Sequence, residues 1–226
     1  MKKKRLTALI LVAALAATPV TALAAGSAEY SDGGSGSSYS SGSSRDYATT
    51  VTVSSTGVKT TGATTSSNGG SSIGVAVDTV TSTGQQVTVN SKGEAVIGDT
   101  AIGFAMGVAA TAGLPNAVVS SIEAINAGQD LATVTTDVDL TGYSALTGTH
   151  AIITKDASTA AVKTGDVEVS LYVPNLLDSL EGVSVLFYDN ATGRWVLLQP
   201  LAVDPVSKTV TVNVSGSGTL SVVYKR

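Results

Sequence analysis

The sequence predicts a mostly β protein: an antiparallel β-sandwich with one short helix packed on it, preceded by a flexible tether. Three observations predict this class. From residue 134 onward, apolar and polar residues alternate with a period of two, as they do in strands with one buried face. Turn residues interrupt the alternation at intervals of about 8–12 residues, which is typical of sandwiches. One segment, at residues 115–127, has the apolar spacing of a helix.

Residues 1–24 have the three parts of a secretory signal peptide. Residues 2–5 are all basic, residues 6–17 are almost entirely apolar, and Ala22 and Ala24 supply the small side chains of a cleavage site. A retained anchor helix is the alternative, but the apolar run is shorter than the roughly 20 residues that span a bilayer. We therefore expect cleavage after residue 24, and a secreted, extracellular protein without a membrane partner.

The composition narrows the partners and the chemistry. The chain has 13 Lys and Arg and 17 Asp and Glu, and loss of the four cations in the signal peptide leaves 9 against 17, a net charge of −8. Nucleic acids and anionic membranes need clustered cations, so neither is an expected partner. Cysteine is absent, which excludes disulfides, thiol nucleophiles and Cys-ligated zinc or iron–sulfur clusters. No cofactor is expected.

Residues 25–72 are predicted to be a disordered Gly/Ser/Thr-rich linker. Gly and Ser make up most of residues 26–44, and Thr, Ser and Gly dominate as far as residue 72. Such a segment has too little apolar surface to offset its ordering entropy. Val51–Val53 alternates like a strand, but the surrounding glycines do not continue the pattern. The segment is either a wall-spanning or glycosylated spacer or a linker left by domain shuffling.

Residues 73–132 are predicted to form a small β-meander followed by the helix. Strands are expected at residues 75–80, 86–90, 95–97 and 101–104, with turn residues between them. The run of small apolar residues at 101–114 contains Gly103-x-x-x-Gly107, a spacing found in membrane helix pairs. Because this run is too short to cross a membrane, we expect it to be buried in the core.

The helix is expected at about residues 115–127. Proline suits the first helical turn, where Pro115 stands. Val118, Ile122 and Ile125 recur at helical spacing and form one apolar stripe. Gly128 has the position of a residue that ends a helix in the left-handed conformation. We expect this helix to pack on a sheet or to cover one end of it.

Residues 133–226 are predicted to form the sandwich itself. Its strands are expected at residues 167–173, 183–188, 195–198, 209–214 and 220–224, each with one apolar face. Trp195 is the only tryptophan in the chain, and we expect it to anchor the sandwich core rather than to stack on a ligand.

Four short motifs occur in order within this segment: V-S-L-Y-V-P at 169–174, V-L-F-Y-D at 185–189, G-R-W-V at 193–196 and T-V-T-V at 209–212. This order resembles a small C-terminal, Ig-like β-sandwich module of secreted and cell-surface proteins of Gram-positive gut bacteria. The resemblance implies a stalk or adhesive domain rather than a catalyst. The last strand is not followed by a sortase motif, so release is expected instead of covalent anchoring to the wall.

By analogy with surface β-domains, the sequence also offers candidates for a Lys–Asn isopeptide cross-link beside an acid. The lysine would be Lys163 or Lys208 and the asparagine Asn175 or Asn213. The sequence alone does not pair them.

Catalytic equipment is sparse. A Ser-His-Asp triad would have to use His150, the only histidine, and the motif S-x-x-K does not occur. Two pairs of carboxylates, Asp137 with Asp139 and Asp166 with Glu168, have the residue type that glycoside hydrolysis needs. The low aromatic content, 4%, counts against a sugar-cleaving site. A calcium site built from loop oxygens is an alternative use of these residues, but no metal site is predicted.

The leading hypothesis is therefore a non-enzymatic, secreted or loosely surface-associated protein with a binding or spacer role, whose partner is an envelope or host glycan or protein. Loops on rigid scaffolds carry recognition, and the candidate ligand-binding residues are Asp189, Asn190, Arg194 and Asn175. One alternative is a hydrolase of envelope or gut polymers. The other is a subunit of a polymeric surface structure, in which Val51–Val53 is donated as a strand.

Overall fold

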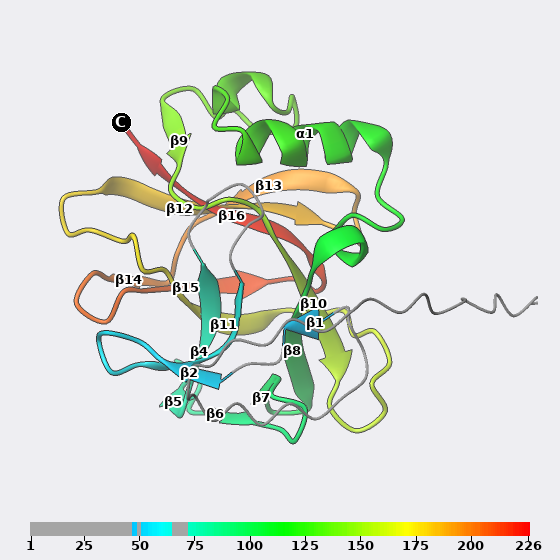
Figure 1. Ribbon diagram of the computed structural model, residues 1–226, viewed down its shortest axis with the longest axis vertical. Coiled ribbons are helices and arrows are strands. Elements are labelled where there is room, and N and C mark those ends of the chain that lie inside the picture. Colours follow the sequence, from blue (N-terminus) through cyan, green and yellow to red (C-terminus); the bar gives the residue numbers. More distant parts are fainter. Residues whose placement is uncertain (1–46, 49–50, 65–71) are drawn as a thin grey trace, which may run out of the picture. The chain divides into compact units, whose positions relative to one another are not determined.

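The computed structural model describes residues 47–48, 51–64 and 72–226, which all belong to one compact unit comprising Ser43–Arg226. The expected signal peptide and most of the expected linker lie outside the described residues. The described residues form two antiparallel sheets and one α-helix (Figure 1). This confirms the predicted class, a mostly β, antiparallel fold with a single helix.

The larger sheet has ten strands among the described residues, in the hydrogen-bonded order β13-β12-β16-β10-β8-β7-β6-β5. Two short strands extend it, since β1 pairs with β8 and β9 with β16. The strands are β1 (Tyr47–Ala48), β5 (Thr79–Val80), β6 (Gln86–Val89), β7 (Ala95–Ile97), β8 (Thr100–Ala105), β9 (Tyr143–Ala145), β10 (His150–Asp156), β12 (Glu181–Asp189), β13 (Arg194–Leu198) and β16 (Gly218–Lys225).

The smaller sheet has six strands within the described part of the chain, in the order β14-β15-β11-β4-β3-β2. They are β2 (Val51–Val53), β3 (Lys59–Thr64), β4 (Ile73–Val77), β11 (Val167–Tyr172), β14 (Ala202–Asp204) and β15 (Thr209–Val214). Strand β4 pairs with β11 in this sheet, and β8 pairs with β10 in the larger one. The segments on either side of residue 133 therefore share both sheets.

The main core lies between the two sheets. Alternate residues of β11 and β15 are buried, as the period-two pattern predicts, and they meet buried residues of the larger sheet such as Val185 and Phe187. The residues contributed by β11 and β15 are Val167, Val169, Leu171, Val210, Val212 and Val214. Each is at most 8% exposed, so removal of apolar surface from water stabilises this pairing of sheets.

A second core lies on the outer face of the larger sheet, under helix α1 (Asn116–Asn126; Figure 1). The predicted stripe of Val118, Ile122 and Ile125 packs here, together with residues of β12, β13 and β16, which are Leu186, Tyr188, Trp195 and Val223. Trp195 therefore anchors the helix to the sheet, and the prediction that it anchors the core between the sheets is wrong. Because β12 is covered on both faces, all its residues from Val183 onward are buried.

Two short 3-10 helices flank α1, namely η1 (Gly107–Ala110) and η2 (Leu131–Thr133). The predicted burial of residues 101–114 holds for β8 but not for η1, where Val108 is 86% exposed. The chain turns outward after Ala105 because Gly107 adopts a φ of 58°, a conformation that glycine tolerates. The expected strand at residues 75–80 is also divided. Asp78 has a φ of 58°, so β4 ends in one sheet and β5 begins in the other.

The described part of the linker predicted at residues 25–72 contains three strands, which are β1, β2 and β3. Strand β3 lies between β2 and β4, and its Thr60 and Thr61 are nearly fully buried. The Thr52 and Thr60 hydroxyls hydrogen-bond across β2 and β3 at 2.9 Å. Threonine is β-branched and suits a pleated surface. These residues are therefore part of the sheet, and the prediction of disorder is wrong for them.

Candidate functional site

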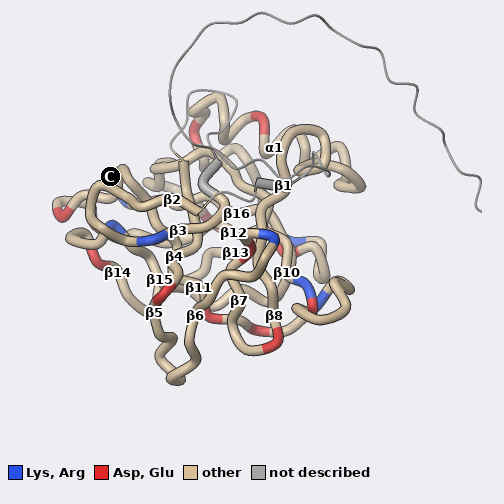
Figure 2. Tube along the Cα trace, turned by 60° about the horizontal axis from the view of Figure 1, so that its bottom comes forward, with Lys and Arg blue, Asp and Glu red and all other residues tan. Residues whose placement is uncertain are grey.

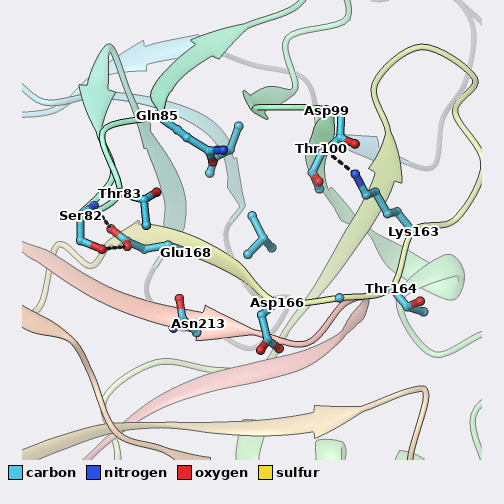
Figure 3. A pocket seen from close by; sticks show the side chains of 13 residues that line it. Ser82, Thr83, Gln85, Asp99, Thr100, Lys163, Thr164, Asp166, Glu168 and Asn213 are labelled. Atoms are coloured by element: carbon cyan, nitrogen blue, oxygen red, sulfur yellow. Dashed lines mark hydrogen bonds and ion pairs between the residues drawn. The ribbon is translucent and has the colours of Figure 1, made fainter.

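A polar groove of about 330 Å³ lies where the turns of β5–β8 approach β11 and β15 (Figure 3). We call this site the polar groove. In Figure 2, acidic residues (red) lie at the turns near β6–β8, on this side of the unit. The lining residues come from four separate parts of the chain: Ser82, Thr83, Gln85, Ile97, Asp99, Thr100, Lys163, Thr164, Gly165, Asp166, Val167, Glu168 and Asn213.

At one end of the groove, Glu168 on β11 is held by the β5–β6 turn. The backbone N–H of Ser82 donates to Glu168 Oε1 at 2.7 Å, and the Ser82 hydroxyl donates to Oε2. The same contacts join the turn of the larger sheet to a strand of the smaller one, so they also fix the width of the groove at this end.

At the other end, Asp99 in the β7–β8 turn forms an ion pair with Lys163 (Figure 3). The hydrogen bond from Lys163 and its positive charge lower the pKa of Asp99. The Asp99 side chain is 80% exposed, so the pair adds little to stability. Its effect is to place a fixed anion and a fixed cation side by side at the rim.

Asp166 and Asn213 lie between these two ends (Figure 3). Together with Gln85 and Thr100 they give the groove both donors and acceptors of hydrogen bonds. Among the residues that the structure describes, no group of three or more His, Asp or Glu side chains is arranged to hold a metal ion. The groove is therefore equipped to bind polar groups by hydrogen bonds.

A second pocket, also of about 330 Å³, lies between α1, residues 133–137 and the β12–β13 hairpin. Two of its polar groups already have partners: the backbone N–H of Trp195 donates to Asp137 Oδ2 at 2.9 Å, and the Ser121 hydroxyl donates to the Val134 carbonyl at 2.7 Å. The rings of Tyr188 and Trp195 are only 4% exposed, which leaves little ring surface for stacking a ligand. This helix-side pocket is the weaker candidate.

The predicted binding loop at Asp189–Arg194 is a tight turn. The side chain of Asp189 is 7% exposed, and its oxygens accept hydrogen bonds from the Ala191 N–H at 2.8 Å and the Thr192 hydroxyl at 3.1 Å. Asp189 thus shapes the turn, while Asn190 and Arg194 are exposed.

The other predicted binding residue, Asn175, is exposed in the connection that leads into β12. That connection and the Asp189–Arg194 turn join opposite ends of β12, a strand of nine residues. A strand of this length spans about 30 Å, so the two segments do not form one binding surface. None of the four predicted residues is among those that line the polar groove, and their role in binding stays a prediction.

The five residues of the hydrolase alternative are dispersed. Asp166 and Glu168 share the polar groove, whereas Asp137 lines the helix-side pocket. His150 is 5% exposed on β10, and its ring lies edge-on to Phe104, with centroids 6.4 Å apart. Asp139 is exposed and accepts a hydrogen bond from the Thr141 N–H at 3.0 Å, and hydrogen bonding by Thr141 lowers its pKa. The structure brings together the pair Asp166 and Glu168.

Sequence reasoning did not identify Ser82, Asp99 or Thr100 as groove residues. Ser82 and Asp99 stand in turns between short strands, Thr100 is the first residue of β8, and none of the three belongs to a chemical motif. Register between the sheets brings these turns beside Lys163 and Asn213, and no pattern in the sequence records that register.

Comparison with known proteins finds no match to this chain among family models, curated proteins or solved structures. Among the described residues, no helix is both long enough and apolar enough to traverse a lipid bilayer.

Proposed function

We propose that this chain is an exported, non-enzymatic β-sandwich protein that binds a hydroxyl-rich ligand, an envelope or host glycan, in the polar groove. The observation that carries the proposal is the lining of the groove, in which carboxylates, amides, hydroxyls and one ammonium converge on about 330 Å³. The signal-peptide pattern supports export. A place among the Ig-like surface modules of gut bacteria is part of the same proposal.

The chemistry of the lining suits sugar hydroxyls. A hydroxyl donates one hydrogen bond and accepts others, so it is matched by a carboxylate next to an ammonium or an amide. Asp99 beside Lys163 and Asp166 near Asn213 supply such combinations (Figure 3). None of the described residues that line the groove is aromatic. We therefore expect recognition by hydrogen bonds and modest affinity for a single sugar unit.

The hydrolase alternative rests on Asp166 and Glu168, which face the same groove. Glycoside hydrolysis needs one carboxyl group that stays protonated to act as the acid. Both oxygens of Glu168 accept hydrogen bonds from Ser82, so this carboxyl group is tied to the β5–β6 turn rather than directed at a glycosidic oxygen. Binding is thus the function that this arrangement supports better.

The polymer alternative rests on β2, an edge strand of the smaller sheet whose Val51 and Val53 are 47% and 67% exposed. Exposed apolar edge strands can pair with a second chain. The backbone of β2 is paired with β3 of its own chain, so donation would require this pairing to break. Size-exclusion chromatography over a range of concentrations tests it, because a strand-donating protein forms large species as concentration rises.

The binding proposal is tested with the secreted protein on an array of envelope and mucin glycans, followed by calorimetric titration of each hit. Asp166→Asn should weaken binding about tenfold, the effect of losing one charge-assisted hydrogen bond. Asp178→Asn is the matched control, since Asp178 is an exposed carboxylate that does not line the groove. Silence across the array, or equal affinity in both variants, would refute the proposal. Shortened glycan products in the titration cell would favour the hydrolase.

A further inference from the structure

Three side chains, two from the β6–β7 turn and one from β10, form a cluster that we call the Lys–Glu–Asn cluster: Lys155, Glu94 and Asn90. Lys155 Nζ lies 2.6 Å from Glu94 Oε1, and Asn90 Nδ2 donates to Glu94 Oε2 at 2.9 Å. One carboxylate therefore contacts an amine nitrogen with one oxygen and an amide nitrogen with the other. Neither the polar groove nor the helix-side pocket includes these residues.

The fold brings the cluster together across three strands. Asn90 and Glu94 flank the β6–β7 turn, and Lys155 is on β10, with β8 between β7 and β10 (Figure 1). Gly103 on β8 makes this reach short, because the Glu94 side chain lies directly over the glycine, with Oε1 3.6 Å from the place of a Cβ atom. A larger side chain at position 103 would occupy the path of Glu94 toward Lys155.

The cluster is largely withdrawn from water. The Glu94 side chain is 6% exposed and that of Lys155 is 14% exposed. Burial raises the pKa of Glu94. The hydrogen bonds from Lys155 and Asn90, together with the charge of Lys155, lower this pKa by more than burial raises it, so the pKa of Glu94 lies below the ordinary value. Glu94 is therefore an ionised carboxylate that holds the Lys155 ammonium at one oxygen and the Asn90 amide nitrogen at the other.

The amide oxygen of Asn90 is held as well. Its Oδ1 accepts hydrogen bonds from the backbone N–H groups of Lys92 and Glu94, at 2.9 and 3.0 Å. Two backbone donors on a carbonyl oxygen polarise the carbonyl and stabilise the negative charge that develops there when a nucleophile adds to the carbon. The β6–β7 turn thus provides the donors of an oxyanion hole around the Asn90 carboxamide.

We propose that Lys155 and Asn90 form an intramolecular isopeptide bond, with Glu94 as the proton carrier. Glu94 takes a proton from the Lys155 ammonium, and the freed Nζ electron pair forms a bond to Asn90 Cγ. Glu94 then protonates Nδ2, the Cγ–Nδ2 bond breaks, and ammonia leaves. The new amide nitrogen loses its extra proton through Glu94 to solvent, where ammonia takes it up as ammonium. The exchange of one amide for another needs no oxidant or co-reactant.

This assignment differs from the pairs that the sequence suggested. Lys163 is paired with Asp99, and Lys208 Nζ donates to the Leu176 carbonyl at 2.5 Å. In the Lys–Glu–Asn cluster the proton carrier, Glu94, contacts both the nucleophile and the leaving group. The bond would covalently join β10 to the β6–β7 turn across β8, and its formation requires no ligand in the groove.

The test is the mass of the full-length protein as purified, with its N-terminus defined by sequencing. We expect a mass lower than that of the sequence by one ammonia molecule. Trypsin should also leave a branched product, because Lys155 as an amide is not a cleavage site. In that product, residues 60–92 are joined to residues 93–163, which remain uncut after Lys155. A full sequence mass in the wild-type protein overturns the proposal without recourse to any variant.

Variants assign the roles. Lys155→Arg keeps the positive charge beside Glu94 but removes the nucleophile, Asn90→Ala removes the acceptor, and Glu94→Gln keeps the size of the side chain but removes the proton carrier. All three should have the full sequence mass. Lys59→Arg is the control and should retain the deficit, since Lys59 is an exposed lysine that also pairs with a carboxylate, Asp78. A deficit that persists in Lys155→Arg would indicate a succinimide at Asn90 and would overturn the cross-link.

Discussion

A single methyl group at Gly218 should destabilise the fold severely. This glycine is in β16, where it pairs with Asp189 of β12 and Ile152 of β10. A Cβ atom there would lie 2.3 Å from the Tyr188 carbonyl oxygen and 2.4 Å from the Phe187 ring. Both neighbours are buried in the centre of the sheet, and one is backbone, so neither can move aside cheaply. Overpacking of this kind costs about 3 kcal/mol in the free energy of unfolding.

The assay is thermal unfolding of Gly218→Ala followed by circular dichroism. For a protein of this size, a loss of about 3 kcal/mol lowers the melting temperature by roughly 6–12 °C. Gly103→Ala is the matched control, because it is also a buried strand glycine of the larger sheet, yet its Cβ would meet nothing closer than 3.6 Å. It should be neutral or stabilising by about 0.5 kcal/mol. Equal melting temperatures for Gly218→Ala and wild type would refute the packing argument.

Three further outcomes follow from the structure. Trp195→Ala should cost about 3–5 kcal/mol because it empties the core beneath α1, whereas Val206→Ala, at an 84% exposed position, should change stability by less than about 0.5 kcal/mol in urea titrations. Hydrogen bonds from Ser158 and Thr159 lower the pKa of Asp156 below its usual 3.8. The ionised Asp156 carboxylate therefore stabilises the folded state at pH values above 3.8, and this stabilisation is lost as the pH falls through the lowered pKa. The acid unfolding of Asp156→Asn should therefore depend less steeply on pH than that of wild type. Asp189→Ala should cost about 1–2 kcal/mol and, if Asn190 and Arg194 bind no ligand, should leave glycan affinity unchanged.

The strands of the C-terminal half were predictable because each has one buried face. In β15, buried Val210 and Val212 alternate with the less buried Thr211 and the exposed Asn213, and this alternation is visible in the sequence itself. Helix α1 was predictable for the same reason, since its apolar stripe meets only one neighbouring surface.

Elements with mixed surroundings were not predictable in this way. Strand β3 is short, rich in threonine and interrupted by Gly62, yet it is held between two strands, and its burial comes from neighbours distant in sequence. The position of Trp195 depended on which face of β13 would be covered by α1, and an isolated strand pattern does not record this. Tertiary contacts decided both outcomes.

Both candidate sites depend on register, which explains why the sequence did not reveal them. The polar groove needs the turns after β5 and β7 to come beside β11, and the Lys–Glu–Asn cluster needs β7, β8 and β10 to align so that Gly103 lies beneath Glu94. A shift of one residue in β8 would put a side chain on the path of Glu94 and reverse the faces of the strand. The chemistry therefore resides in the sheet as a whole, and side chains larger than alanine at position 103 should affect the cross-link even though glycine has no reactive group.

The location of the cluster gives the proposed cross-link a mechanical consequence for the groove. Strands β5, β6 and β7 form one edge of the larger sheet, which we call the sheet margin. The margin joins the rest of the sheet through β8, which pairs with β10. The turns of this margin carry Ser82 and Asp99, which form one wall of the groove, while Asp166 and Asn213 belong to the opposite wall. A covalent bond from the β6–β7 turn to β10 restrains the wall that carries Ser82 and Asp99 against movement within its own sheet. Ligand binding then orders fewer side chains and costs less conformational entropy, which is how a fixed scaffold increases affinity without adding a contact.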